Sequence, residues 1–227
     1  MKNSLKMLCR QSALVGGRDP TLNPTTRPLR SIGLQRGSVS PRGSIMSQPW
    51  LRGSGIEPFE VNSIETSQQS VPQVLWIGCS DSDPRESSVY RIPNDQSLEL
   101  RNLGNMVIEG DLSSETMIKH AVVDLQVKHI VVCGHYGCRI VKSVCRDGLQ
   151  GPWLSRRLNS LHMSHENDLS QLPISERDHS FVKINVLDQL RILRTFPEVS
   201  EAIALGNLHI HGVVHDPERN ISHQIME

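Results

Sequence analysis

The chain carries the apolar run Val74-Leu75-Trp76-Ile77-Gly78, which leads directly into Cys79-Ser80-Asp81. A second apolar run, residues 129–134, leads in the same way into His135-Tyr136-Gly137-Cys138. Apolar runs of this length that are rich in β-branched residues are typical of buried strands. Open α/β sheets bind their ligands at the carboxyl ends of their parallel strands. The two runs therefore predict an α/β fold in which two thiols, an imidazole and a carboxylate lie at one edge of a parallel sheet.

The side chains that follow these two strands are of the types that bind zinc. Each one taken alone has a structural interpretation, because a single cysteine is usually a small buried hydrophobe. Their joint position at two strand ends favours a metal site instead, made by Cys79, Asp81, His135 and Cys138. The remaining cysteines are expected to be structural or incidental: Cys9, Cys133 and Cys145.

Three sequence blocks, residues 76–82, 101–105 and 134–138, together resemble the β-class carbonic anhydrases. The order and spacing of the blocks match that family, and the resemblance extends over about residues 72–217. It implies a single domain with a mostly parallel central sheet flanked by helices. It also implies a carbonate dehydratase, which reversibly hydrates carbon dioxide to bicarbonate and a proton, and an assembly that is a homodimer or a dimer of dimers.

The resemblance assigns roles to the candidate site residues. Zn²⁺ would be held by Cys79, His135 and Cys138. Asp81 would be either the fourth zinc ligand or the catalytic group that accepts the proton of the zinc-bound water. Arg101, at the end of a strand, would brace the site.

One position departs from the family pattern Cys-Ser-Asp-Ser-Arg, because the residue in the place of the arginine is Asp83. In the family this arginine holds the aspartate off the metal through a charge-assisted pair of hydrogen bonds, and a catalytic zinc needs an open fourth position. Without the arginine, Asp81 is expected to coordinate zinc directly and to make catalysis weak or conditional. Arg85 could reach back to replace it, and Arg139 could hold an anion or pair with Asp83.

Two functions of different classes follow from this departure. The first is a zinc enzyme that hydrates carbon dioxide. The alternative is a carbonic anhydrase-like zinc protein with little catalysis, acting as a binding or regulatory subunit. The intact set of zinc ligands favours the enzyme, and Asp83 is the feature that favours the alternative.

The 227 residues divide into a basic leader and an acidic domain, residues 55–227. Residues 1–54 are rich in Ser, Arg, Gly and Pro and hold nine Lys or Arg against one acid, Asp19, as is typical of a mitochondrial transit peptide. The alternatives are a disordered basic tail and a cytoplasmic form that starts at Met46. The domain carries 15 basic and 23 acidic residues, so no nucleic-acid surface is expected. No apolar stretch reaches membrane-spanning length, and five cysteines without an extracellular framework indicate reduced thiols.

The apolar pattern of the domain predicts alternating strands and helices. The predicted strands are residues 74–78, 98–100, 129–134 and 208–214. The predicted helices are residues 113–127 with Ser113 or Ser114 as the N-cap, one from about Cys138, one from Pro152, and residues 176–195.

The last predicted strand contains three alternating histidines, His209, His211 and His215, which look like a metal-binding tract. The period of a strand places His209 and His211 on one face. The structural interpretation is favoured, because no cysteine or carboxylate from another strand is known to complete such a site.

Overall fold

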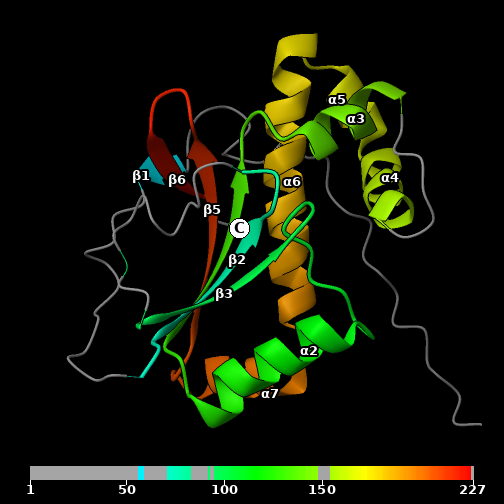
Figure 1. The fold of residues 1–227 in the computed structure, drawn as a ribbon. Coiled ribbons are helices and arrows are strands. Elements are labelled where there is room, and N and C mark those ends of the chain that lie inside the picture. The colour runs from blue at the N-terminus through cyan, green and yellow to red at the C-terminus, as the bar shows by residue number, and fades with distance from the viewer. Residues whose placement is uncertain (1–55, 59–70, 83–91, 93–94, 148–153, 226–227) are drawn as a thin grey trace, which may run out of the picture. The chain divides into compact units, whose positions relative to one another are not determined.

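The computed structural model describes residues 56–58, 71–82, 92, 95–147 and 154–225. In this part of the chain, a six-stranded sheet has the order β1-β6-β5-β4-β2-β3 (Figure 1). The strands are β1 (Ile56–Pro58), β2 (Val74–Cys79), β3 (Ser97–Asn102), β4 (His129–His135), β5 (His209–Asp216) and β6 (Ile221–Ile225). The helical elements are α2 (Leu112–Lys119), the π-helical turn η4 (His120–Asp124), α3 (Arg139–Asp147), α4 (Leu154–Ser164), α5 (Glu166–Ser170), α6 (Ile174–Leu193) and α7 (Pro197–Ala204).

The centre of the sheet is parallel, as the sequence predicts. β2 pairs in parallel with β3 and with β4, and β4 pairs in parallel with β5. β6 and β1 add antiparallel pairs at one side. Because β2 and β4 are parallel neighbours, their carboxyl ends, Cys79 and His135, lie at the same edge of the sheet. The mostly parallel α/β sheet flanked by helices is therefore confirmed.

The two strands that lead to the site are buried along their whole length. Such burial is expected of parallel strands covered on both faces, and it explains why their sequences are continuous apolar runs. The long helix α6 lies against β4 and β5 (Figure 1). A Cβ atom on Gly134 would lie 2.8 Å from Val186 Cγ2 and 3.0 Å from Val182 Cγ1, both on α6. The glycine therefore lets α6 approach the end of β4 closely, next to His135.

Several element boundaries differ from the prediction. The N-cap of α2 is Asp111 rather than Ser113 or Ser114, because the Asp111 carboxylate accepts a hydrogen bond from the Ser114 backbone N–H at 2.9 Å. The helix expected over residues 113–127 ends its α-helical part at Lys119 and continues as η4. Strand β6 was not predicted, because the sequence ISHQI carries only a weak apolar alternation.

Some predictions fall on residues outside those described. They include the leader, residues 1–54, and Pro152. The helix expected from Pro152 is described from Leu154 onward, as α4. Among the described residues, no helix is both long enough and apolar enough to cross a lipid bilayer.

Candidate metal centre

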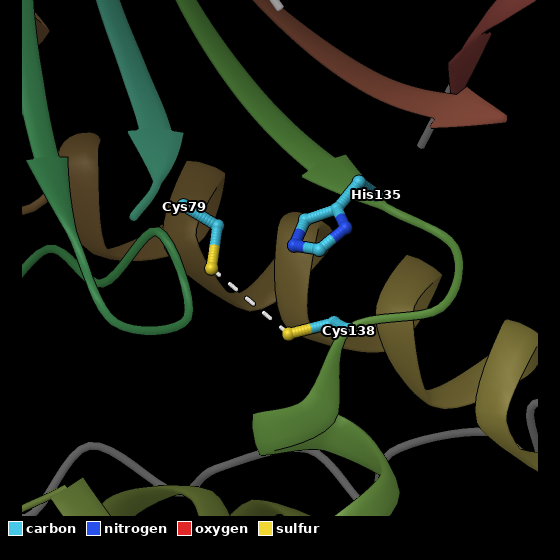
Figure 2. Close-up of side chains that lie close together, drawn as sticks. All are labelled: Cys79, His135 and Cys138. Carbon is cyan, nitrogen blue, oxygen red and sulfur yellow. Dashed lines mark hydrogen bonds between the residues drawn. The ribbon is translucent and has the colours of Figure 1, made fainter. Parts of the chain in front are cut away.

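Three of the predicted site residues come together at the carboxyl edge of the sheet. Cys79 is the last residue of β2, His135 is the last residue of β4, and Cys138 directly precedes α3. One ligand atom from each lies within 4.8 Å of the other two, and all three residues are buried. Figure 2 shows the two sulfur atoms and the imidazole directed toward one another. We call these three residues the thiol–imidazole cluster.

A tight turn brings Cys138 back to the cluster. Gly137 lies in this turn with φ at 81°, a left-handed conformation that favours glycine. The turn is tied to the sheet by the backbone N–H of Tyr136, which donates to the carbonyl oxygen of His215 at 2.9 Å. The short spacing from His135 to Cys138 therefore depends on a glycine between them.

The spacing of the two sulfur atoms fits a tetrahedral metal. The Cys79 and Cys138 Sγ atoms are 3.9 Å apart, and both cysteines are free thiols. Two thiolates on one tetrahedral zinc, each with a Zn–S bond of about 2.3 Å, would be about 3.8 Å apart. The donor set and its spacing therefore fit zinc without rearrangement of the sulfurs.

The ring of His135 is oriented by the backbone. Its Nδ1 lies 3.2 Å from the carbonyl oxygen of Tyr136, which can only accept a hydrogen bond. Nδ1 is therefore the protonated nitrogen, and Nε2 is left to serve as the metal-binding atom. A hydrogen bond from the ring nitrogen that does not bind the metal is the usual way in which proteins fix the tautomer of a ligating histidine.

The Cys79 sulfur lies in surroundings that stabilise negative charge. The pKa of Cys79 is lowered to about 4, chiefly by the hydrogen bond with the Cys138 thiol, against the opposing effect of burial. The backbone N–H groups of Gly104 and Asp81 also donate to this sulfur, at 3.2 and 3.4 Å. The pKa of Cys138 is raised, first because its thiol hydrogen-bonds to the Cys79 sulfur, then because it is buried and its ionisation would put a second negative charge beside Cys79. A cation bound between the sulfurs would remove that repulsion.

Asp81 lies at the same edge but faces a different partner. Its Oδ2 accepts a hydrogen bond from the backbone N–H of Arg139 at 2.7 Å, and its Oδ1 accepts one from Arg139 Nε at 2.6 Å. Arg139 Nη2 also lies 2.5 Å from Oδ1. Although burial raises the pKa of Asp81, the hydrogen bonds and the charge of Arg139 lower it below its usual value overall. Arg139, the first residue of α3, therefore holds the Asp81 carboxylate in its charged form.

This arrangement differs from the one expected from the sequence, in which Asp81 coordinates the metal. Among the described residues, the group of potential ligands that lie within mutual reach consists of Cys79, His135 and Cys138, without Asp81. Among the described residues, the partner of Asp81 is Arg139, which the sequence analysis had paired with Asp83 or an anion. Asp83 and Arg85 lie outside the described residues. Whether Asp81 is a fourth ligand in the metal-bound protein stays a prediction.

Arg101 braces the turn that carries Asp81, which confirms its expected position. Its Nη2 donates to the carbonyl oxygen of Cys79 at 2.7 Å and to that of Ser82 at 3.1 Å. The neighbouring Asn102 closes the next loop, because its side chain both donates to and accepts from the backbone of Met106, each at 2.7 Å. These bonds fix the two backbone segments that surround the Cys79 sulfur.

A buried polar pair on α6, Asn185 and Gln189, forms hydrogen bonds to the backbone of the loop after Asn102. Asn185 Nδ2 donates to the carbonyl oxygen of Gly104 at 2.9 Å, and Gln189 Oε1 accepts from the backbone N–H of Val107 at 2.8 Å. Gln189 Nε2 donates to Asn185 Oδ1 at 2.9 Å, so the two side chains form one chain of hydrogen bonds. Both residues are almost fully buried. The pair therefore fixes the backbone whose Gly104 N–H contacts Cys79.

Sequence reasoning missed two parts of this site. Arg139 was noticed, but its expected partner was Asp83 or an anion rather than Asp81. Asp81 lies two residues after Cys79 and Arg139 directly follows Cys138, at the same sheet edge, and this shared position was a usable signal. Asn185 and Gln189 carried no signal beyond being polar residues at i and i+4 on the apolar side of a helix.

Comparison with known proteins agrees with this geometry. A family model described as carbonic anhydrase matches residues 74–220. A carbonic anhydrase of Emericella nidulans is 36% identical over 150 residues, a match that covers 64% of this chain and 64%, just under two thirds, of that protein. Among solved structures, the β-carbonic anhydrase CafD of Aspergillus fumigatus is 38% identical with a TM-score of 0.66, over 75% of this chain and 99% of that chain. A tetrameric β-carbonic anhydrase of Sordaria macrospora is 32% identical with a TM-score of 0.64, over 68% of this chain and 80% of that chain. The chain therefore belongs to the carbonic anhydrase family, in its β class.

Proposed function

We propose that this protein binds zinc through Cys79, His135 and Cys138 and catalyses the reversible hydration of carbon dioxide to bicarbonate and a proton. The observation that carries the proposal is the buried cluster of two thiols and an imidazole, with ligand atoms within 4.8 Å of one another. A zinc ion held there would supply the Lewis acidity that makes water a nucleophile at neutral pH.

The chain's own residues supply the remaining requirements. Catalysis needs a fourth coordination position that no protein group fills. Because its carboxylate is held by the backbone and side chain of Arg139, Asp81 would leave that position open. The same carboxylate is then a charged acceptor beside the cluster, suited to orient or receive a proton from a water molecule. In the family pattern, an arginine at the position of Asp83 holds the aspartate away from the metal. Here Arg139 would take over that role.

The position of Arg139 makes this activity conditional. The Arg139 side chain is 84% exposed, whereas that of Asp81 is 4% exposed. Ion pairs with an exposed partner are screened by salt. We therefore expect hydration activity to fall as ionic strength rises, because a weakened pair lets Asp81 turn toward the metal.

Metal analysis tests the ligand assignment. The purified full chain should retain one tightly bound zinc after dialysis, and Cys79→Ala or Cys138→Ala should lose it, because a single thiolate and an imidazole remain. Cys145→Ala is the matched control, since Cys145 is a half-buried free thiol outside the cluster. Full zinc retention in Cys138→Ala would overturn the assignment.

The alternative function is a zinc protein with little catalysis, acting as a binding or regulatory subunit. It predicts the same zinc content, so only a hydration assay separates it from the enzyme. Stopped-flow measurement on zinc-loaded protein that shows no rate above the uncatalysed reaction would favour the alternative and leave the metal assignment standing.

We also infer a homo-oligomeric state and a mitochondrial location. The tetrameric assembly of the Sordaria macrospora relative supports a homodimer or dimer of dimers, which light scattering on the purified protein would test. The nine basic residues and single acid of residues 1–54 support import. A fluorescent protein fused behind these residues should reach mitochondria, and a fusion that begins at Met46 should stay in the cytoplasm.

A further inference from the structure

Three histidines gather at the edge of the sheet opposite the thiol–imidazole cluster. His129 begins β4 and His209 begins β5, and the strand register pairs them with one another. His211 lies two residues further along β5, so its side chain is on the same face as that of His209. We call His129, His209 and His211 the histidine cluster. Within the cluster, His129 lies six residues before His135 on β4, which is roughly 20 Å at the rise of a strand.

The ring of His129 lies beside the rings of the other two histidines. His129 Nδ1 lies 3.1 Å from His211 Nε2. The ring centroids of His129 and His211 are 5.2 Å apart, and those of His129 and His209 are 5.7 Å apart. His129 thus supplies a third potential ligand from a second strand, an imidazole rather than the cysteine or carboxylate that the sequence analysis had considered. His215, the third histidine of β5, has a different environment, because it is buried and hydrogen-bonded to Ser222 at 3.0 Å.

The facing nitrogens of His129 and His211 have the spacing of two ligands on one metal. Two nitrogens bound to a tetrahedral zinc at 2.0–2.1 Å would be about 3.3 Å apart. His209 completes the set only after its ring turns, since the compact ligand group found among the described residues is the thiol–imidazole cluster. His209 is exposed, which leaves its ring room to turn toward the other two.

We propose that His129, His209 and His211 form a second metal site, which binds a divalent transition metal through imidazole nitrogens alone. Zinc, copper and nickel are the ions that such ligands favour. Binding replaces the N–H···N hydrogen bond between His129 and His211, and its proton moves to the other nitrogen of the same ring or to solvent. The bound ion would join the amino ends of β4 and β5 and stabilise the folded state. This site is independent of the proposed carbon dioxide hydration.

Zinc titration of the full chain tests the proposal. Equilibrium dialysis at buffered micromolar free zinc should show one further equivalent beyond the tightly held ion. His209→Asn and His211→Asn should each weaken this extra equivalent by at least roughly 10- to 100-fold, the cost usual even for groups one shell further from a metal. His120→Asn is the matched control, because it removes an exposed histidine paired with Asp124 outside the cluster.

The variants also separate the two sites. Cys138→Ala should lose the tight ion and keep the extra one, whereas His209→Asn should do the reverse. If His211→Asn does not fold, His209→Asn decides the question, because His209 is exposed and its replacement leaves the core intact. An extra equivalent that survives both histidine changes, that falls equally in His120→Asn, or that never appears would overturn the proposal. Zinc should raise the melting temperature of Cys138→Ala but not that of its combination with His209→Asn.

Discussion

The Asp81 carboxylate accepts two hydrogen bonds from Arg139, one from the backbone N–H at 2.7 Å and one from Nε at 2.6 Å. Because Arg139 directly follows Cys138, the residue that holds Asp81 is anchored to a candidate zinc ligand. The aspartate and the metal position are thereby linked through a single short segment of chain.

Replacement of Arg139 by alanine should lower the hydration rate by roughly 10- to 100-fold, as expected for a group next to a metal ligand. The zinc content should stay full, and the affinity for zinc should stay the same or rise. The reason is that the Asp81 carboxylate keeps only the backbone N–H of residue 139 and loses the guanidinium, so it would be drawn toward the metal and would fill its open position. Stopped-flow assays and metal analysis on the same preparations check both parts. Arg146→Ala is the control, because Arg146 is an exposed cation on the same helix. Equal losses of zinc and of activity in Arg139→Ala would point to a merely structural role.

Introduction of an arginine at position 83 should rescue the Arg139→Ala variant. Asp83→Arg restores the family pattern, and its guanidinium can supply two parallel hydrogen bonds to Asp81. In the wild-type background the same change should have a much smaller effect, since Arg139 already holds the carboxylate. The hydration rates of the wild type, the two single variants and the double variant form a complete cycle. Strictly additive effects would contradict the idea that the two arginines serve one purpose.

The buried pair on α6 should contribute to stability. Gln189→Leu leaves the Val107 N–H and the Asn185 side-chain oxygen without their hydrogen bonds in a buried place, which should cost about 1–3 kcal/mol in the free energy of unfolding. Urea denaturation would measure this loss, with the exposed Gln171→Leu as the control. If Gln189→Leu were as stable as the wild type, the loop that contacts Cys79 would not depend on α6 in the way described.

The stability of the metal-free protein should depend on pH through His211. Its pKa is lowered to about 4 in the folded state, whereas an unfolded histidine titrates near 6.5. Between these values the unfolded chain binds a proton at this position that the folded chain does not, so stability falls as pH drops from about 6.5 to about 4. Denaturation in the presence of a chelator should show a shallower pH dependence for His211→Asn than for the wild type. Identical slopes would rule out a contribution from this histidine.

The sequence was most informative where one physical cause dominated. The runs before Cys79 and His135 are buried on both faces, so their composition alone predicted parallel strands and placed the cluster at their ends. Asp111 was missed as a helix cap because three neighbouring polar residues compete for that position. Strand β6 was missed because pairing with β5, rather than its own pattern, holds it in the sheet. The Asp81–Arg139 pair and the histidine cluster join residues 58 and 82 positions apart. Neither contact follows from local pattern, since both depend on which strands become neighbours.

The central claim is that an open zinc site, with Asp81 held aside by Arg139, makes this chain a carbon dioxide hydratase. Stopped-flow measurement of carbon dioxide hydration by the zinc-loaded, full-length protein at low ionic strength tests it most directly. We predict a rate well above the uncatalysed reaction that disappears in Cys138→Ala and declines as salt is added. A folded protein with full zinc at the cluster and no hydration activity at any salt concentration would contradict the claim.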